Sequence, residues 1–414
     1  MTSSFLFWAI IAIVLADFFL EIYLQALQIK ASKWPVPKVL EGLYDPEKYS
    51  RQQSYFRENS RMSFITGSVS TLIMLAFFCL GGYPWLDSVA RAFSAHAPLQ
   101  ALCFFGIIFI AEWILSLPLE AYSTFVIEQK YGFNKSTPSL FIGDSLKSLL
   151  LEGIISGGLL MLCTWLYTLS PEWFWIYAWA VFTFFSLGLQ YFYSELIVPL
   201  FNKQKPLEEG PLREAIEALA QKTGFQIENI YVMDSSKRTT KANAYFTGFG
   251  KKRRVVLFDT LIEQLSPEET VGVLAHEIGH YKHNHLVKGM ISSAVSSLVT
   301  FWLFSLIIDS AVIAGAALCD QPSFWVNLAV FSMLLSPIGL ILGIVSNAVS
   351  RKHEHQADAF AKSYGCGPAE SSGLKKISAQ SLSNLTPHPV VVFMEYSHPT
   401  LAERVTFLEN GDMN

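Results

Sequence analysis

Two histidines four residues apart give this chain its clearest chemical signal, in the stretch His276-Glu277-Ile278-Gly279-His280. On a helix, side chains at positions i and i+4 lie one above the other, so both imidazoles can reach one ion. Zinc takes such nitrogen ligands at about 2.0–2.1 Å. Glu277 would then be placed to accept a proton from a zinc-bound water. The same pentapeptide also arises by chance, so its context has to decide.

A catalytic zinc site needs a third protein ligand and leaves its fourth position to water. We expect Glu354 to be that ligand. Asp358, one helical turn later, would orient a ligand imidazole through its second ring nitrogen. His353 and His355 compete with Glu354, each about 100° round the helix, and are otherwise histidines of the interface or surface.

The composition indicates a membrane protein, because 51% of the residues are hydrophobic, 15% are charged and the mean hydropathy is +0.35. Seven apolar runs are long enough to span about 30 Å of hydrocarbon. They are Phe5–Ile29, Phe64–Tyr83, Leu99–Thr124, Ser145–Leu169, Trp173–Val198, Val287–Ile308 and Phe324–Val349. The first is expected to be a retained helix and not a signal peptide, since no Lys or Arg precedes it and it is too long for an h-region.

The distribution of Lys and Arg orients these spans, because short loops rich in them stay cytoplasmic. The segments after the first and third spans are basic, whereas the loops near Arg91, Ser170 and Asp320 offer one Arg between them. We therefore expect the N-terminus outside, and the segment from Pro199 to Glu277 and the tail after Arg351 on the cytoplasmic side. A net charge of −4 gives no reason to expect a nucleic-acid partner.

The chain is expected to divide into a membrane domain with five spans, residues 1–198, and a domain that carries the metal motif and the last two spans, residues 199–414. The latter begins with a proline-punctuated connector, Pro199 to Pro206. Apolar spacing then predicts helices at Leu212–Thr223 and Leu261–Leu265, and short strands at Ile227–Met233, Asn243–Gly248 and Arg254–Phe258. The expected fold is thus mainly α, with a small α+β domain.

The helix with the two histidines should begin at Ser266-Pro267-Glu268-Glu269, which combines a capping Ser, a Pro in the first turn and acidic residues at the helix N-terminus. No proline follows before Ile308, so we expect it to run continuously into the sixth span, or with a slight bend at Gly289. His280 would then lie about 10 Å before the hydrocarbon. His283 and His285 are accordingly interpreted as interfacial.

The five cysteines show no metal-type spacing and are interpreted as small core residues, not as disulfides or metal ligands: Cys79, Cys103, Cys163, Cys319 and Cys366.

Taken with the segment Ser350-Arg-Lys-His-Glu354-His-Gln-Ala-Asp358, the histidine motif resembles the type I CAAX prenyl endopeptidases, which are integral-membrane zinc metalloproteases. The resemblance runs nearly end to end. Further segments that carry it are Glu41–Asp45, Glu128–Lys135, Val198–Asn202, Asn243-Ala-Tyr245 and Ser397–Arg404. The shorter membrane heat-shock proteases share only the metal motifs and have fewer spans.

This resemblance implies a seven-helix bundle around a water-filled chamber, with one zinc ion at its cytoplasmic end and a substrate strand along Asn243. It also implies that His398 donates a hydrogen bond to the oxyanion and that Arg404 braces the site or the substrate. By sequence alone, His398 also fits a polar turn that caps a helix containing Arg404. Carboxylates within the spans must face water or a partner, and they are Glu112, Glu120 and Glu152.

We therefore expect a membrane-embedded zinc endopeptidase that cleaves the C-terminal regions of CAAX-type peptides, prenylated or not, within a lipid bilayer. One alternative is a quality-control protease for membrane proteins that needs no prenyl group. Another is a catalytically idle scaffold or transporter, against which the intact Glu277 argues, since a purely binding zinc site needs no base. A bacterial inner membrane is the first expected location and the endoplasmic reticulum the second. No oligomer is predicted.

Overall fold

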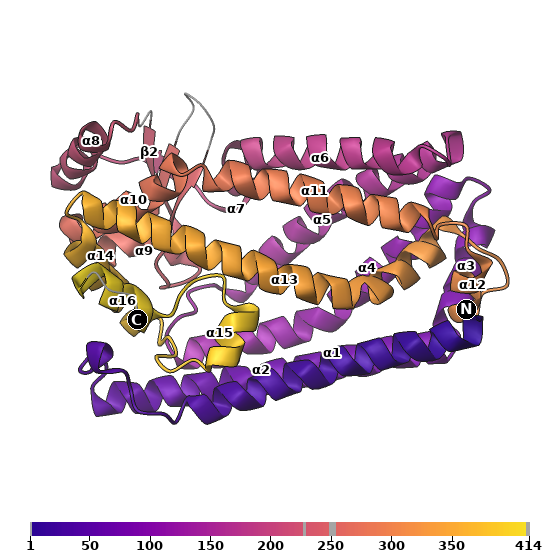
Figure 1. Ribbon diagram of the computed structural model, residues 1–414, viewed down its shortest axis with the longest axis horizontal. Helices are drawn as coiled ribbons and strands as arrows, with labels where there is room; N and C mark the ends of the chain where they lie inside the picture. Colours follow the sequence, from indigo (N-terminus) through magenta and orange to yellow (C-terminus); the bar gives the residue numbers. More distant parts are fainter. Residues whose placement is uncertain (1, 227–228, 248–253, 411–414) are drawn as a thin grey trace.

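The computed structural model describes residues 2–226, 229–247 and 254–410. Its long helices run along one axis, with the described chain ends at opposite ends of the bundle (Figure 1). Seven helices are long and apolar enough to cross a membrane, and each predicted run overlaps one of them. They are Ser3–Ala31, Pro46–Cys79, Ala97–Glu128, Pro138–Leu169, Phe174–Phe201, His285–Ser305 and Phe324–Ser363.

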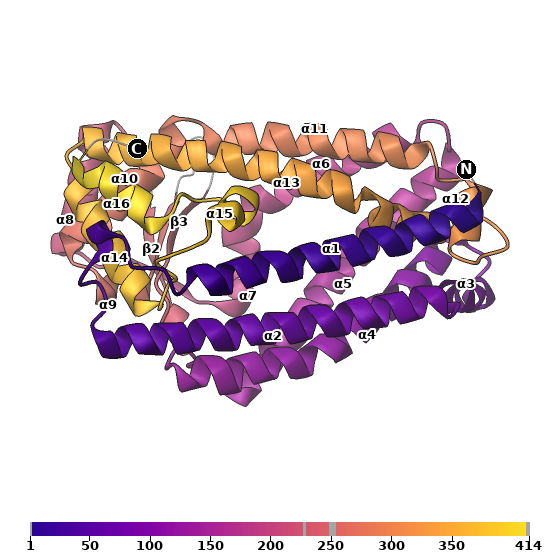
Figure 2. The ribbon, with the colours of Figure 1, turned by 60° about the horizontal axis from the view of Figure 1, so that its bottom comes forward.

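In this bundle α1 (Ser3–Ala31) and α2 (Pro46–Cys79) lie side by side (Figure 2). The short helices α3 (Gly82–Phe93) and α12 (Ala311–Ala316) lie at the end of the bundle that holds the N-terminus (Figure 1). The third span consists of α4 (Ala97–Tyr122) and a π-helical turn at Ser123–Glu128. The fourth span is α5 (Pro138–Leu169). The fifth span consists of α6 (Phe174–Phe192), a π-helical turn at Tyr193–Ile197 and α7 (Val198–Phe201). The last two spans are α11 (His285–Ser305) and α13 (Phe324–Ser363).

Several spans begin at a capping side chain. Asp45 accepts a hydrogen bond from the backbone of Lys48, and Thr137 does the same for Leu140, each followed by a proline in the first helical turn. These residues satisfy amide groups that a helix start otherwise leaves unpaired. The second span ends earlier than predicted, at Cys79, because Gly81 adopts a left-handed φ of 80° that turns the chain into α3.

The α+β part lies at the opposite end of the bundle from the N-terminus (Figures 1 and 2). Its four strands have the order β1-β2-β4-β3, with β2 and β4 parallel and both outer strands antiparallel to their neighbours. They are β1 (Gln204–Pro206), β2 (Asn229–Met233), β3 (Ala244–Thr247) and β4 (Arg254–Phe258). The remaining helices are α8 (Pro211–Thr223), α9 (Asp259–Gln264), α10 (Pro267–Lys282), α14 (Gly367–Gln380), α15 (Pro389–Glu395) and α16 (Leu401–Asn410).

The three predicted strands are present, although residues 227–228 and 248 of those predictions lie outside the described residues. The predicted connector contains a strand that the sequence analysis missed, β1, which pairs with β2 through Gln204 and Met233. The five cysteines are all free, but the interpretation as core residues is wrong for Cys79, which is exposed near the end of α2.

The prediction of a continuous helix from Pro267 to Ile308 is wrong. The helix with the two histidines, α10, ends at Lys282, and α11 begins at His285. Between them Asn284 adopts a left-handed φ of 56°, a conformation that Asn tolerates better than most residues because its short side chain can hydrogen-bond locally. The turn therefore falls before Gly289, and it changes the direction of His285.

A cavity of about 940 Å³ lies between α4, α5 and the first residues of the α+β part. Glu112 and Glu120 of α4 and Glu152 of α5 line it. These side chains are exposed although they belong to membrane-spanning helices. Facing a hollow spares a carboxylate the cost of contact with lipid, and the cavity agrees with the chamber that the resemblance implies.

Polar contacts link the membrane helices that line this cavity to the α+β part. Arg238 Nη2 lies 2.6 Å from Asp144 Oδ2 of α5, and Lys241 Nζ lies 2.9 Å from Glu128 Oε2 at the end of the third span. The backbone amide of Lys135 also donates to the carbonyl of Arg238 at 3.0 Å. The membrane helices thereby hold the segment that leads into β3.

Candidate metal centre

The helix α10 starts with a complete capping box. Ser266 Oγ accepts a hydrogen bond from the amide of Glu269 at 3.2 Å, and Glu269 Oε2 accepts one from the amide of Ser266 at 2.8 Å. This reciprocal pair fixes where the helix begins, and therefore which residues face its neighbours.

Two glycines let α10 approach those neighbours closely. A Cβ atom at Gly272 would lie 2.5 Å from the backbone nitrogen of Glu370 in α14, and one at Gly279 would lie 2.9 Å from Cα of Ala357 in α13. Real Cβ atoms do not come this close to backbone atoms. The absence of side chains at these two positions therefore allows α13 and α14 to contact the face of α10 that carries the histidines.

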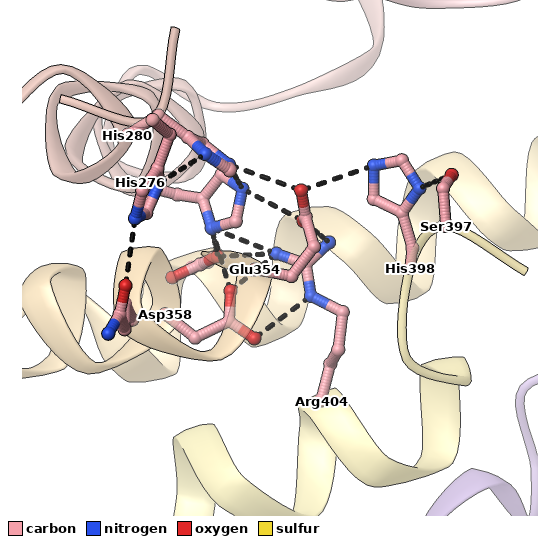
Figure 3. Close-up of polar contacts among 10 residues, drawn as sticks. His276, His280, Glu354, Asp358, Ser397, His398 and Arg404 are labelled. Atoms are coloured by element: carbon pink, nitrogen blue, oxygen red, sulfur yellow. Dashed lines mark hydrogen bonds and ion pairs between the residues drawn. The ribbon is translucent and has the colours of Figure 1, made fainter. Parts of the chain in front are cut away.

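Three side chains with metal-binding atoms converge at this contact (Figure 3). The Nε2 atoms of His276 and His280 are 3.0 Å apart. Glu354 of α13 places Oε2 3.3 Å from His276 Nε2 and Oε1 3.2 Å from His280 Nε2. Ligand atoms about 2.0–2.1 Å from a tetrahedral ion are about 3.3 Å apart. The three side chains thus have the spacing of one face of such a site.

The electrostatics of these atoms fit a cation. Glu354 is 5% exposed, and its buried Oε2 atom accepts no hydrogen bond from the described residues, the nearest nitrogens being His276 Nε2 at 3.3 Å and Arg404 Nη1 at 3.7 Å. A buried carboxylate oxygen without a partner is costly. A metal ion between the three side chains would satisfy that oxygen and both imidazole nitrogens. Of the described residues, His276, His280 and Glu354 form one of two groups that could hold a metal ion.

Asp358 and Arg404 lie directly behind His276. Asp358 Oδ1 lies 2.7 Å from His276 Nδ1, the ring nitrogen that points away from the donor cluster. The guanidinium of Arg404 contacts both carboxylate oxygens of Asp358, with Nη2 at 2.5 Å and Nε at 3.0 Å (Figure 3). Although burial alone lowers the pKa of Arg404, the carboxylates of Asp358 and Glu370 raise it above its usual value. Arg404 is therefore a permanent cation here.

Glu370 joins Asp358 and Arg404 behind His276, a position that the sequence did not predict. Its Oε1 atom accepts a hydrogen bond from Arg404 Nη2 at 2.9 Å and lies 3.1 Å from His276 Nδ1. Burial raises the pKa of Glu370 above its usual value. The second possible metal group consists of His276, Asp358 and Glu370, but the Arg404 guanidinium already contacts both carboxylates. In the sequence Glu370 resembles an ordinary acidic residue in the first turn of a helix.

His280 is held by a residue that we had interpreted as interfacial. His285 is only 7% exposed, and its Nδ1 atom lies 2.9 Å from His280 Nδ1. Its other nitrogen, Nε2, lies 2.9 Å from Oε1 of Gln356 in α13. The interfacial interpretation of His285 is therefore wrong, because the turn at Asn284 brings its ring back towards α10. His283 and His353 instead stack on the ring of His285.

Of the remaining residues predicted from sequence, His398 lies beside the donor cluster. Glu277, on α10 between the two histidines, is partly exposed, and within the described residues its carboxylate has no protein partner. Asn243 is exposed and precedes β3, an edge strand that α10 contacts. His398 has a 61% exposed side chain, with Nε2 3.4 Å from Glu354 Oε1 and Nδ1 2.9 Å from Ser397 Oγ (Figure 3). His355 packs on Phe407 instead.

The position of His398 depends on α13 as well. Arg351 Nη1 donates to the carbonyls of Val392 at 3.0 Å and Tyr396 at 2.6 Å, at the carboxyl end of α15. The segment with His398 leaves α15 at this point. The helix α13 therefore carries the ligand Glu354 and, through Arg351, also anchors the segment that holds His398.

A helical membrane bundle with a buried His-His-Glu cluster beside an edge strand is the architecture of a membrane-embedded metallopeptidase. Two family models match the chain: "CAAX prenyl protease N-terminal, five membrane helices" over residues 25–203 and "Peptidase family M48" over residues 206–411.

Full-length relatives agree with these matches. The chain is 36% identical to "CAAX prenyl protease 1 homolog" of Oryza sativa, over 98% of this chain and 97% of the relative. It is 34% identical to "CAAX prenyl protease 1" of Saccharomyces cerevisiae, over 95% and 93% of the two chains. The crystal structure of S. mikatae Ste24p matches with a TM-score of 0.92 and 33% identity, over 98% of this chain and 99% of that one.

The chain therefore belongs to peptidase family M48, and within it to the CAAX prenyl proteases. Membership makes it a multi-pass membrane metalloendopeptidase, and activation of water by zinc is the general mechanism of the family. This confirms the enzyme class expected from the sequence.

Proposed function

We propose that this protein holds one zinc ion through His276 Nε2, His280 Nε2 and a carboxylate oxygen of Glu354, and that it cleaves peptides near their C-termini. The observation that carries the proposal is the spacing of 3.0–3.3 Å among these donor atoms. Two nitrogens and one carboxylate oxygen are the ligand set of many catalytic zinc sites, which keep a fourth position open. Asp358 orients His276 by accepting its Nδ1 proton.

When bound, the zinc ion supplies Lewis acidity that activates a water molecule. The Glu277 carboxylate accepts the proton of that water and delivers it to the leaving amide nitrogen. Glu277 suits this role because no protein group engages its carboxylate among the described residues. His398, on the far side of Glu354, donates a hydrogen bond to the oxyanion of the attacked carbonyl.

The substrate backbone is proposed to lie as an added strand along β3, next to Asn243. In the sheet formed by the described residues, β3 is an outer strand, and such a strand can pair with an added one. Arg404 keeps Asp358 ionised and in place through two hydrogen bonds. These four residues, Glu277, His398, Asn243 and Arg404, therefore divide proton transfer, oxyanion stabilisation, strand alignment and bracing among themselves.

The names of the relatives suggest a prenylated CAAX peptide as substrate. We propose that the cavity between α4 and α5, whose lining includes Arg238 and Thr239 of the segment leading into β3, takes up part of such a substrate. The test is to incubate the purified full chain with a farnesylated and an unfarnesylated peptide of the same CAAX sequence and to map the products by mass spectrometry. Cleavage at one bond near the C-terminus, faster with the farnesyl group, supports the proposal. A misfolded membrane protein of unrelated sequence is the third substrate, and its cleavage at the rate of the farnesylated peptide would favour the quality-control alternative.

We also propose a boundary between domains 1–198 and 199–414, and an active site that faces the cytoplasm. The basic segment after α1 supports this orientation. Single cysteines near Asp45 and Gly210 should react with a membrane-impermeant reagent only from the cytoplasmic side, and ones near Ser94 and Asp320 only from the other. The opposite labelling would reverse the orientation. A bacterial inner membrane, ahead of the endoplasmic reticulum, stays a prediction.

A further inference from the structure

The two histidines of the metal centre are held from behind in different ways. His276 Nδ1 contacts the carboxylate of Asp358. His280 Nδ1 contacts another imidazole, His285, whose second nitrogen contacts the side-chain amide of Gln356. Both distances in this second chain of contacts are 2.9 Å. Gln356 lies on α13, the same helix as Glu354 and Asp358, so α13 supports both imidazoles.

Counting protons fixes the direction of every hydrogen bond in this chain. A neutral imidazole carries one N–H group and one lone pair. To bind a metal through Nε2, His280 must keep its proton on Nδ1, so Nδ1 donates. His285 must then accept at its own Nδ1, and its proton lies on Nε2. That proton needs an acceptor, and Gln356 Oε1 is placed to accept it.

The opposite arrangement shows which tautomer of His280 the amide oxygen of Gln356 prevents. If a donor occupied the position of Gln356 Oε1, His285 would accept at Nε2 and carry its proton on Nδ1. It would then donate to His280 Nδ1, and His280 would carry its own proton on Nε2, where the metal should bind. We infer that Gln356, acting through His285, is a positioning residue that holds His280 in the tautomer able to bind zinc. This inference rests on the proposed metal site.

The break between α10 and α11 is needed for this arrangement, because it directs His285 towards His280. In a continuous helix, residues five apart point about 140° away from each other. His285 would then face away from His280. The left-handed Asn284 instead starts a new helix and returns His285 to within hydrogen-bond distance of His280. The turn that the sequence did not reveal therefore belongs to the metal site.

The test compares two changes at Gln356 in the full-length, detergent-solubilised protein. Gln356→Met keeps the length of the side chain but removes the acceptor, whereas Gln356→Glu keeps an acceptor oxygen. Zinc affinity is measured by competition with a chromophoric chelator, together with the visible spectrum of the Co²⁺ form. We expect Gln356→Met to weaken zinc binding by about 10–100-fold and to alter the Co²⁺ spectrum. Gln356→Glu should stay close to wild type in both.

Controls separate positioning from folding. His283→Ala removes a ring that stacks on His285 at 5.5 Å without a hydrogen bond to it among the described residues, and it should keep wild-type zinc affinity. Thermal unfolding of the metal-free protein must show that Gln356→Met still folds cooperatively, although the loss of one hydrogen bond to the buried His285 should lower its unfolding temperature slightly. If Gln356→Met does not fold, Gln356→Asn serves instead, since its shorter chain withdraws the oxygen.

Wild-type zinc affinity in a folded Gln356→Met or Gln356→Asn variant would overturn the inference, and so would a loss in Gln356→Glu as large as that in Gln356→Met. The proposed metal site is judged separately, by zinc binding to the wild type and its loss in Glu354→Ala. If that loss occurs while the Gln356 variants bind normally, only the positioning role fails.

Discussion

Gly279 offers a sharp test of how the contact between α10 and α13 sets the metal site. Replacing it with alanine should have two opposing effects on the free energy of unfolding and a separate effect on zinc affinity. A Cβ atom there would lie 2.9 Å from Cα and 3.0 Å from the carbonyl oxygen of Ala357, and 3.0 Å from Cβ of Phe360. Ordinary contact begins at 3.4 Å. The two helices must therefore separate by about 0.5 Å, since backbone atoms cannot rotate away.

The size of the effect follows from this displacement. Alanine favours a helix interior over glycine by about 1 kcal/mol, while overpacking costs about 1–3 kcal/mol. The net change in the free energy of unfolding is thus small, between roughly 0 and 2 kcal/mol of destabilisation. Glu354, however, moves with α13. A shift of about 0.5 Å exceeds the roughly 0.2 Å that metal–ligand distances tolerate, so zinc affinity should fall at least about tenfold.

The assay is chelator competition for zinc, combined with thermal unfolding of the metal-free protein. Gly289→Ala is the matched control, because it lies inside α11 and its Cβ would meet nothing within 4 Å. That variant should bind zinc normally. Gly279→Ala with wild-type zinc affinity would refute the reasoning, since the close contact would then have no role in placing Glu354 against the two histidines.

Four further outcomes are expected. Glu277→Gln should keep zinc and the fold but abolish cleavage, because it removes the base, and turnover near wild type would contradict that role. His398→Ala should lower turnover by about 10²–10³ with an unchanged zinc content. Arg351→Met should also lower turnover while zinc stays bound, because the carboxyl end of α15 loses its anchor; full turnover would show that His398 needs none. Finally, burial tends to raise the pKa of Glu269, but hydrogen bonds from Lys376, Ser372 and the Ser266 amide lower it below its usual 4.5. The stability that ionised Glu269 contributes is therefore present above about pH 4.5 and lost below it, so unfolding temperature should fall less steeply with acid in Glu269→Gln.

The sequence predicted those features that local periodicity controls. The apolar runs located the seven spans, and helical spacing placed His276 and His280 on one face of α10. The start of α10 was also predictable, since a capping box is a local signal at Ser266 and Glu269.

Features that depend on tertiary contacts were not predictable. No proline or glycine marks the turn at Asn284. Its left-handed conformation starts α11, in which the ring of His285 contacts that of His280. Glu370 has no signal of its own, because an acidic residue in the first turn of α14 is ordinary until Arg404 and His276 pack against it. Gln356 is likewise an unremarked polar residue until His285 meets it.

Anomalous diffraction at the zinc absorption edge, from crystals of the purified protein, tests the central claim most directly. We predict one zinc peak per chain, about 2.0–2.1 Å from the Nε2 atoms of His276 and His280 and from a carboxylate oxygen of Glu354, and its loss in Glu354→Ala. The absence of a peak, or a zinc ion bound by His353 or His355 in place of Glu354, would contradict the account.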